Sequence, residues 1–217
     1  MRFGAVVLAA GRSSRMVPVN KLLMSLGDRP VIRHVAQTAL DAGLDPVTVV
    51  SGHDREAIHA ALAGLPVRAV GNDDHEKGLA SSIRAGVAAI AAEVDAALFL
   101  LGDMPLVTPR HLRHLLAAFA PAQGHSICIP TYGTRRGNPV LWSAQHFPRL
   151  LELSGDQGAR VLFRELADHI LEVDMPDDAV LVDIDTQAAL DAARDRFGQA
   201  EAAWADHPPR SASLSAL

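Results

Sequence analysis

Residues 4–23, GAVVLAAGRSSRMVPVNKLL, decide how the chain folds. The apolar run Ala5–Ala9 is typical of a buried parallel strand, and it stops at Gly11, where a short polar turn begins. A strand that leads through such a turn to the start of a helix directs several backbone N–H groups toward one point, which suits an anionic phosphate. Three cationic residues lie within ten positions: Arg12, Arg15 and Lys21. The stretch therefore predicts a loop that binds a polyphosphate.

Two well-known phosphate loops are excluded, because the stretch has neither the GxxxxGK[ST] pattern of a P-loop nor the GxGxxG pattern of a dinucleotide fold. On residue types alone, an ordinary solvated turn is the alternative. The order LAAGRSSRM and then NKLL resembles the signature of the MobA-like nucleotidyltransferases, and is closest to the molybdenum cofactor cytidylyltransferases. The resemblance implies catalytic roles for Arg15 and Lys21. It also implies nucleotide contacts from Leu8, Ala9, Ala10, Gly11, Arg12, Ser13, Ser14, Arg15 and Lys21.

The signature departs from the family pattern in one place. Val17 stands where the family usually has glycine, and Pro18 follows it, so we expect a stiffer loop. The sequence LAAG, in place of LAGG, resembles the members that use CTP more than those that use GTP.

Composition limits the class of protein. A chain of 217 residues can form one large domain or two small ones, and 49% hydrophobic with 21% charged residues is typical of a soluble globular protein. The net charge of −5 provides no basic field for nucleic acid, so an anionic ligand must meet a local cationic cluster. Cys128 is the only cysteine, which excludes an intramolecular disulfide and a multi-cysteine metal site. The first strand follows Met1-Arg2 directly and no long apolar run is present, so we expect a cytoplasmic protein without a signal peptide or membrane span.

Strands and helices alternate in the first half of the chain. The apolar runs that predict strands are 5–9, 47–50, 67–70 and 96–101. Residues with helical spacing follow each run, and Thr108-Pro109 provides a cap and a first-turn proline for the fourth helix. This order predicts an α/β fold: a Rossmann-like three-layer α/β/α arrangement with a mostly parallel sheet and its ligand at the carboxyl ends of the strands.

The second half is less regular. We expect strands at 126–130, 139–142, 170–173 and 180–184, the last two forming a pair, with a loop at 132–137. Short helices are expected near 147–155 and 161–166, and an Ala-rich helix at 187–197. We expect one domain over residues 1–197, with a nucleotide-binding half (1–120), an acceptor-binding half (121–197) and a loose tail (198–217).

Asp103 is the strongest single candidate for chemistry. It follows a buried strand, and Gly102 leaves room for a phosphate or a metal ion to approach. On spacing alone, a turn aspartate that caps Met104-Pro105 is an equal alternative. LLGDMPLVTP resembles the metal-site motif of the family, which implies that Asp103 binds the Mg²⁺ that bridges the nucleotide phosphates, with Gly102 beside the nucleotide.

Asp183 and Asp185 form a second acidic site at the end of a predicted strand. Alternation in a strand places both carboxylates on one face, where they repel each other unless a cation lies between them. The alternative is that Asp185, like Thr186, only caps the following helix. VDIDT resembles the stretch that supplies the second metal-binding acid in the family.

Two further segments resemble the nucleotide side of the family. Ser51-Gly52-His53 is similar to the segment beside the base, although a simple turn histidine is an equal interpretation. Gly78-Leu79-Ala80-Ser81-Ser82 is similar to GLSSS, which implies contacts from Gly78, Leu79, Ser81 and Ser82, and helix capping is the alternative. By contrast, His111 and His114, beside Arg110 and Arg113, are expected on a solvated helix face.

Two segments resemble the acceptor side. RGNPVLW is similar to RGHPVLF and implies acceptor contacts from Gly137, Asn138 and Pro139. GDQGAR matches the GDxGAR loop, which implies that Asp156 and Arg160 contact the acceptor, although the residues alone indicate only a turn.

The resemblance implies a Mg²⁺-dependent cytidylyltransferase that joins CMP from CTP to a molybdopterin-type cofactor and releases pyrophosphate. Transient contact with a molybdoenzyme is then an expected partnership. Two alternatives stay open: transfer to another phosphorylated acceptor, such as a sugar or polyol phosphate, and a non-catalytic protein that binds the cofactor for insertion into a molybdoenzyme.

Overall fold

An eight-stranded sheet organises the protein in the computed structural model, which describes residues 1–11, 20–156 and 158–197. The strand order is β10-β7-β9-β6-β1-β4-β5, with the short β8 paired to β7. Only β8 and β9 run antiparallel to their neighbours. The strands are β1 (Phe3–Ala9), β4 (Val47–Ser51), β5 (Arg68–Gly71), β6 (Ala96–Leu101), β7 (Ile127–Tyr132), β8 (Arg135–Arg136), β9 (Val140–Ser143) and β10 (Ile170–Asp174). A separate hairpin pairs β2 (Ser25–Leu26) with β3 (Arg29–Pro30).

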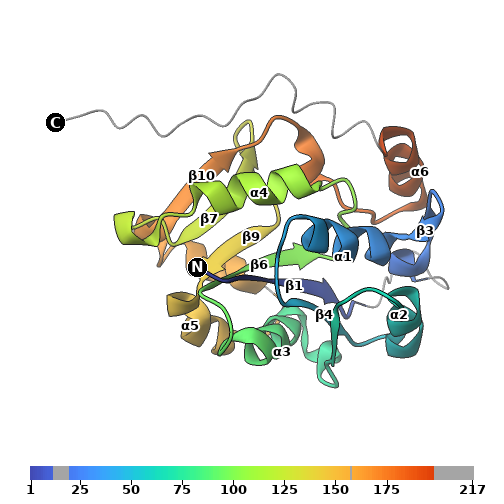
Figure 1. Ribbon diagram of the computed structural model, residues 1–217, viewed down its shortest axis with the longest axis horizontal. Helices are drawn as coiled ribbons and strands as arrows, with labels where there is room; N and C mark the ends of the chain where they lie inside the picture. The colour runs from blue at the N-terminus through green and yellow to red at the C-terminus, as the bar shows by residue number, and fades with distance from the viewer. Residues whose placement is uncertain (12–19, 157, 198–217) are drawn as a thin grey trace.

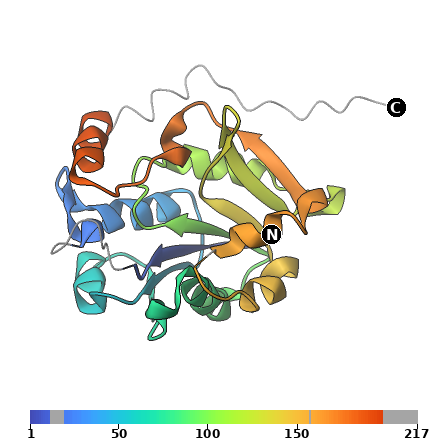
Figure 2. The ribbon, with the colours of Figure 1, turned by 180° about the vertical axis from the view of Figure 1, so that it is seen from behind.

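Helices cover both faces of the sheet, which confirms the expected Rossmann-like, mostly parallel α/β architecture (Figures 1 and 2). The α-helices are α1 (Val31–Asp41), α2 (Arg55–Ala61), α3 (Leu79–Ile90), α4 (Pro109–Ala118), α5 (Phe147–Leu151) and α6 (Gln187–Arg196). The side chains of β1 alternate between two cores: Val7 packs with α1, α2 and α4, whereas Val6 packs with α3 and α5. Period-two alternation in a strand buried on both faces explains why β1 is apolar throughout.

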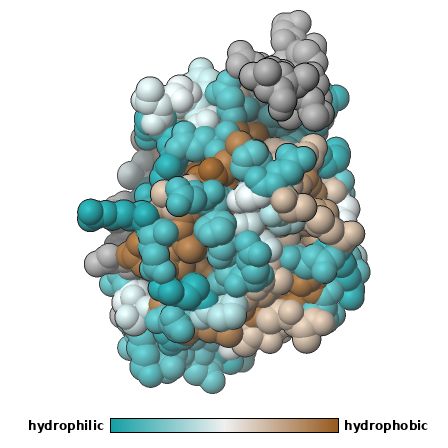
Figure 3. Space-filling model, turned by 90° about the vertical axis from the view of Figure 1, so that its left-hand side faces the viewer, coloured by the Kyte–Doolittle hydropathy of each residue, from teal (hydrophilic) through white to brown (hydrophobic). Residues whose placement is uncertain are grey.

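Short 3₁₀ helices connect these elements. They are η1 (Lys21–Leu23), η2 (His75–Lys77), η3 (Pro121–Gln123), η4 (Ala144–His146), η5 (Gly158–Phe163), η6 (Ala167–His169) and η7 (Asp178–Leu181). Within the described ranges, no helix has the length and apolar character that a bilayer span requires. The face of the molecule on the left of Figure 1 carries polar side chains with separate apolar patches between them (Figure 3).

Three expectations for the second half were wrong. Residues 180–184 form no strand, because their backbone groups bond to loops: Asn138 N–H donates to the Val180 carbonyl, and Ile184 N–H donates to that of Asp103, each at 2.9 Å. β10 pairs instead with β7. The expected loop at 132–137 contains the end of β7 and β8, and the expected helix at 161–166 is replaced by η5. The expected tail, 198–217, lies outside the described residues.

A third, smaller core joins the hairpin to the end of the chain. It is formed by Leu26, Val31, Leu106, Ala179, Ile184, Leu190 and Ala193. These residues come from the hairpin, the start of α1, the loop after β6, η7, the segment after it and α6, which lies beside β3 in Figure 1. This small core therefore holds the segment with Asp183 and Asp185 against the loop with Asp103.

Cys128 lies in β7 and is fully buried, and burial raises the pKa of its thiol to about 12. At pH 8 only about one thiol in 10⁴ is then ionised, and the thiolate is the reactive form. We expect the folded protein to resist alkylation by iodoacetamide at pH 8, and the protein in guanidinium chloride to take up one label per chain. Stoichiometric labelling of the folded protein within minutes would contradict the burial of this side chain.

Candidate functional site

Three carboxylates from two distant parts of the chain meet at one edge of the sheet. One oxygen each of Asp103, Asp183 and Asp185 lies within 4.8 Å of the others. Asp103 follows β6, whose carboxyl end lies beside that of β1 because the two strands are parallel neighbours. Ile184, between the two other acids, is fully buried in the small core, and its N–H bonds to the Asp103 carbonyl. The cluster is therefore held in place by backbone and packing.

Lys21 reaches into this cluster from η1. Its Nζ lies 2.6 Å from Oδ2 of Asp103 and 2.5 Å from Oδ1 of Asp185. The three side chains are largely buried, with exposed fractions of 14%, 18% and 33% for Lys21, Asp103 and Asp185. Among the described residues, three carboxylates and one ammonium group give a local charge of −2, so these carboxylates carry more negative charge than Lys21 neutralises.

Burial and charge act against each other on the two central groups. Burial raises the pKa of Asp103 above its usual value, and the ammonium group of Lys21 offsets part of this rise. For Lys21, burial acts to lower the pKa, but Asp103 and Asp185 together raise it above its usual value. Lys21 therefore stays charged near neutral pH and acts as the counter-ion of the cluster.

The two carboxylate oxygens of Asp103 differ in their contacts. Oδ1 of Asp103 is buried and has no hydrogen-bond partner among the described residues. A buried carboxylate oxygen without a partner is costly, whereas a hard divalent cation prefers ligands of this type. The charge of the cluster, its all-oxygen donors and this unpartnered atom fit Mg²⁺ or a similar ion.

Asn20 fixes the position of Lys21, and the sequence interpretation did not include it. The side chain of Asn20 is buried; its Oδ1 accepts the Leu22 N–H at 3.0 Å and caps η1. Its Nδ2 donates to Oδ2 of Asp54 at 3.1 Å, and Asp54 makes no capping bond to α2. The NKLL stretch carried this signal, because Asn is a preferred residue before the first turn of a helix.

The structure describes only some of the signature residues that are predicted to contact the nucleotide. Ala9, the last residue of β1, and Ala10 are buried, whereas Gly11 is exposed and Leu8 is half-buried. Gly102 N–H donates to the Leu8 carbonyl at 3.0 Å and ties the two strand ends together. The rest of the loop, residues 12–19, lies outside the described residues and includes Arg12, Ser13, Ser14, Arg15, Val17 and Pro18.

The serines at the start of α3 are engaged inside the protein. Nδ2 of Asn72 donates to Oγ of Ser81 at 2.8 Å and to Oγ of Ser82 at 3.0 Å, and Ser81 donates to the Gly78 carbonyl. All three side chains are buried. Their hydroxyl and amide groups therefore join the end of β5 to α3, and Leu79 is the exposed residue of the segment.

The predicted nucleotide contacts at the end of β4 also differ in their exposure to solvent. Ser51 is fully buried, and its Oγ lies 2.9 Å from Nε2 of His59. Gly52 packs against His75, because a Cβ at this position would lie 2.5 Å from that side chain. His53 is exposed and lies 3.5 Å from a carboxylate oxygen of Asp54. Of these three predicted nucleotide contacts, only His53 presents its side chain to solvent.

The predicted acceptor segments touch the other parts of the site. Asn138 N–H donates to the Val180 carbonyl, and Gly137 allows this approach because a Cβ there would lie 2.2 Å from that oxygen. Pro139 is buried and the Asn138 side chain is half-buried. Asp156 and Arg160 are exposed. The RGNP segment therefore packs directly against the chain that leads to the acidic cluster.

Gly78 joins a nucleotide-side segment to an acceptor-side segment. A Cβ at position 78 would lie 2.2 Å from Oδ1 of Asp156 and 2.6 Å from the Gly155 carbonyl oxygen, and φ of Gly78 is +96°. The Gly155 carbonyl also accepts the Ala80 N–H at 3.1 Å. Only glycine fits both this backbone conformation and this contact.

We expect Gly78→Ala to lower the free energy of unfolding by about 3 kcal/mol, because it combines a left-handed φ with a steric clash. Gly43→Ala is the matched control, since Gly43 has φ of +85° and a methyl group at this position would meet no atom within 4 Å. The control measures the cost of a positive φ without a steric clash, about 1–2 kcal/mol. Urea unfolding of both variants tests the contact, and equal losses would show that the Asp156 loop yields without cost.

His111 was placed wrongly on a solvated face. Its side chain is fully buried at the start of α4; Nδ1 accepts the Thr108 N–H at 3.0 Å, and Nε2 lies 3.2 Å from Oδ1 of Asp177. The neighbouring arginines suggested exposure, but the spacing from Thr108 to His111 is that of a capping box, which was the available signal. His114 is half-buried.

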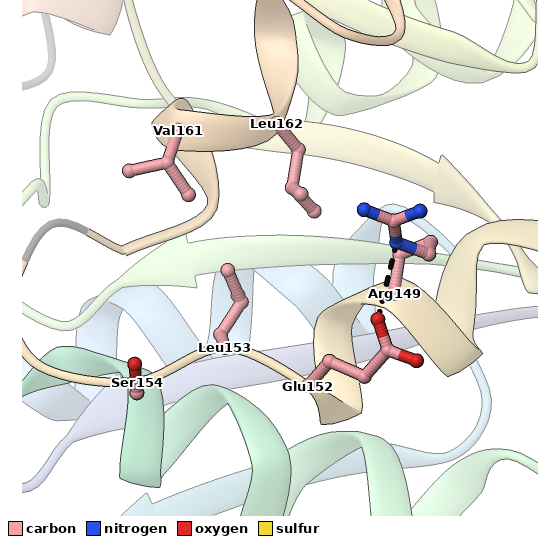
Figure 4. Close-up of a pocket in the computed structure, with 6 residues that line it drawn as sticks. All are labelled: Arg149, Glu152, Leu153, Ser154, Val161 and Leu162. Atoms are coloured by element: carbon pink, nitrogen blue, oxygen red, sulfur yellow. Dashed lines mark ion pairs between the residues drawn. The ribbon is translucent and has the colours of Figure 1, made fainter.

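A separate pocket of about 350 Å³ lies between α5 and η5 (Figure 4). It is lined by Arg149, Glu152, Leu153, Ser154, Val161 and Leu162. The Arg149 guanidinium lies 3.3 Å from Glu152 and 2.8 Å from Glu165, so carboxylates of the chain already neutralise its charge. None of the predicted site residues lines this pocket, and the acidic cluster is the better candidate site.

The chain has relatives of several kinds. The model of the MobA-like NTP transferase domain matches residues 5–170, which include Lys21 and Asp103. The chain is 31% identical over 186 residues to nicotine blue oxidoreductase of Paenarthrobacter nicotinovorans, covering 83% of this chain and 91% of that protein. It is 37% identical over 134 residues to the bifunctional protein GlmU of Sorangium cellulosum, covering 58% of this chain but only 28% of that protein.

Solved structures share the fold over nearly the whole chain. A nucleotidyl transferase from Methanothermobacter thermautotroptrophicus superposes with a TM-score of 0.81 and 31% identity, covering 90% of this chain and 97% of that one. Rv0371C of Mycobacterium tuberculosis H37Rv, in complex with manganese, has a TM-score of 0.76 and 27% identity, covering 90% and 99% of the two chains.

Proposed function

The chain belongs to the MobA-like NTP transferase family of nucleotidyltransferases, and we propose that it transfers CMP from CTP to a molybdopterin-type cofactor with release of pyrophosphate. The observation that carries this proposal is the acidic cluster with Lys21 at the carboxyl ends of β1 and β6. The choice of CTP rests on LAAG, and the choice of acceptor rests on the RGNP and GDQGAR segments. In this proposal residues 1–120 bind the nucleotide and residues 121–197 bind the acceptor, within one domain.

Asp103, Asp183 and Asp185 would hold a divalent cation. The unpartnered Oδ1 of Asp103 and the local charge of −2 support this assignment, and the related Rv0371C has been solved with manganese. We propose Mg²⁺ as the cation in the cell. When bound, Mg²⁺ supplies charge neutralisation and Lewis acidity at the nucleotide phosphates.

The residues of the chain then have simple tasks. A phosphate monoester is already an anion at neutral pH, so the attack on the α-phosphorus requires no strong general base. Lys21 stays positively charged near neutral pH, and we propose that Lys21, with Arg15 from the signature loop, interacts with the phosphates once a metal ion binds the carboxylates. The close packing of Gly78 on the Asp156 loop supports a fixed relative position of nucleotide and acceptor.

Two other functions are compatible with the same fold. Nucleotidyl transfer to a different phosphorylated acceptor needs the same cluster and a different acceptor half. A non-catalytic protein that binds the cofactor for a molybdoenzyme is favoured by Val17 and Pro18 in the signature. We propose a cytoplasmic protein that meets such an enzyme only transiently, without nucleic acid or membrane binding.

A panel of the four nucleoside triphosphates tests the proposal. Each is incubated with the protein, Mg²⁺ and purified molybdopterin-type cofactor, and pyrophosphate release is followed. We expect release with CTP and little with GTP, ATP or UTP. A second series replaces the cofactor with a sugar or polyol phosphate. Pyrophosphate release only in that series would show that the acceptor is a sugar or polyol phosphate. Tight cofactor binding without release would favour the non-catalytic function.

A further inference from the structure

A buried chain of hydrogen bonds links two loops beside the acidic cluster. It runs from Thr108 through His111 to Asp177. A backbone N–H only donates, so Nδ1 of His111 accepts the bond from Thr108, and the neutral ring carries its proton on Nε2. That N–H donates to Oδ1 of Asp177 at 3.2 Å. His111 is fully buried, and the Asp177 side chain is 17% exposed.

The two ends of this link belong to the two segments that carry the acidic cluster, here called the acidic segments: residues 103–111 and residues 177–185. Thr108 and His111 start α4, which directly follows the loop of Asp103. Asp177 precedes η7, accepts the Ala179 N–H at 2.9 Å and so caps the segment that leads to Asp183. Burial acts to raise the pKa of Asp177, but the bonds from His111 and Ala179 lower it, so this carboxylate is ionised near neutral pH.

Besides their packing in the small core, two hydrogen bonds between described residues connect the acidic segments. One is the bond from Ile184 N–H to the Asp103 carbonyl, next to the carboxylates themselves. The other is the bond from His111 to Asp177, at the far ends of both segments. The three carboxylates outnumber the cations among the described residues and repel one another, so their spacing depends on such restraints.

We propose that His111 and Asp177 form a positioning pair that sets the spacing between Asp103 and the two later carboxylates, and thereby the affinity of the site for a divalent cation. The proposal rests on the proposed function, because it assigns the cluster to a metal ion. Neither residue touches the ion; both act through the two loops that they connect. Groups bonded directly to a metal ligand typically change metal affinity by about 10–100-fold, and for a pair that acts through the loops we expect the lower end of this range.

Substitutions at His111 separate positioning from simple folding stability. In His111→Gln the amide N–H₂ replaces the Nε2 donor to Asp177. In His111→Asn the shorter amide oxygen replaces the Nδ1 acceptor for Thr108 but cannot reach Asp177. His146→Asn is the matched control, since His146 is also buried and its Nε2 lies 2.9 Å from Oγ of Ser126, before β7 and thus at the opposite edge of the sheet.

The readout is the binding of Mn²⁺ alone to the metal-free protein, measured by calorimetry, together with thermal unfolding in EDTA. We expect His111→Asn and Asp177→Ala to weaken Mn²⁺ binding by about tenfold, and the double variant to be no weaker than either. His111→Gln should stay within about threefold of the original protein. His146→Asn should lower stability and leave Mn²⁺ binding unchanged.

Two results would overturn the proposal, in different ways. If His111→Asn and Asp177→Ala unfold at lower temperature but bind Mn²⁺ as well as the original protein, the pair only stabilises the fold, and the nucleotidyltransferase proposal survives. If the original protein binds no Mn²⁺ at all, the cluster is not a metal site, and both proposals fail together.

Discussion

Asp103→Asn is expected to lower the rate of pyrophosphate release by about 10³-fold or more while the fold stays intact. The substitution keeps the shape of the side chain but removes its charge, the strong bond to Lys21 and the anionic character of the buried Oδ1. The backbone carbonyl of Asp103, which anchors Ile184, is unchanged. The local charge of the cluster falls from −2 to −1, so Mn²⁺ binding should weaken as well.

The comparison for this variant is Asp191→Asn on the exposed surface of α6, where the described partners of the carboxylate, Gln187 and Arg194, lie on the same helix. Circular dichroism and thermal unfolding establish that both variants are folded, and initial rates at saturating CTP give the effect on turnover. If Asp103→Asn retains most of the original rate, the metal assignment is wrong, whatever the fate of Asp183 and Asp185.

Lys21→Met is expected to lower turnover by about 10²–10³-fold, because it removes a cation that we propose to interact with the phosphates. It should also destabilise the metal-free protein by about 2–4 kcal/mol, since two largely buried carboxylates lose their counter-ion. Mn²⁺ should then bind more tightly than before, because Lys21 no longer competes for Asp103 and Asp185. Added Mn²⁺ is expected to restore the stability but not the rate.

Lys77→Met is the natural control, because Lys77 is the only other lysine and its side chain is 68% exposed beside Asp74. Thermal unfolding with and without Mn²⁺, followed by rate measurements, separates the two roles of Lys21. A Lys21→Met protein that turns over at the original rate would remove this residue from the catalytic proposal.

The sequence was sufficient for the central strands β1, β4 and β6, because they are mostly apolar runs buried on both faces of the sheet. Runs such as 96–101 predict a strand without any knowledge of its neighbours. Residues 180–184 have similar composition, but whether they pair depends on the loops around them. They bond to the carbonyl of Asp103 and to the N–H of Asn138, and no local pattern contains that information.

The site was predictable where strand ends determine it. Parallel strands end at one edge, which was enough to place Asp103 beside the end of β1, and the structure also brings Asp183 and Asp185 to Asp103. His111 was misplaced because its burial depends on Asp177, 66 positions later in the chain. Asn72, which joins β5 to α3, was missed for the same reason. The roles of Arg12 and Arg15 stay predictions, since they lie outside the described residues.

The small core under α6 has a consequence for how the protein loses activity on heating. Two of the three acids depend on it, yet α6 contributes only Leu190 and Ala193 to it, whereas the large sheet has two extensive cores of its own. A unit with so few apolar contacts opens before the whole molecule melts. Amide exchange should therefore be fast along α6 and η7 while β1 and β6 remain protected, and inactivation should precede global denaturation.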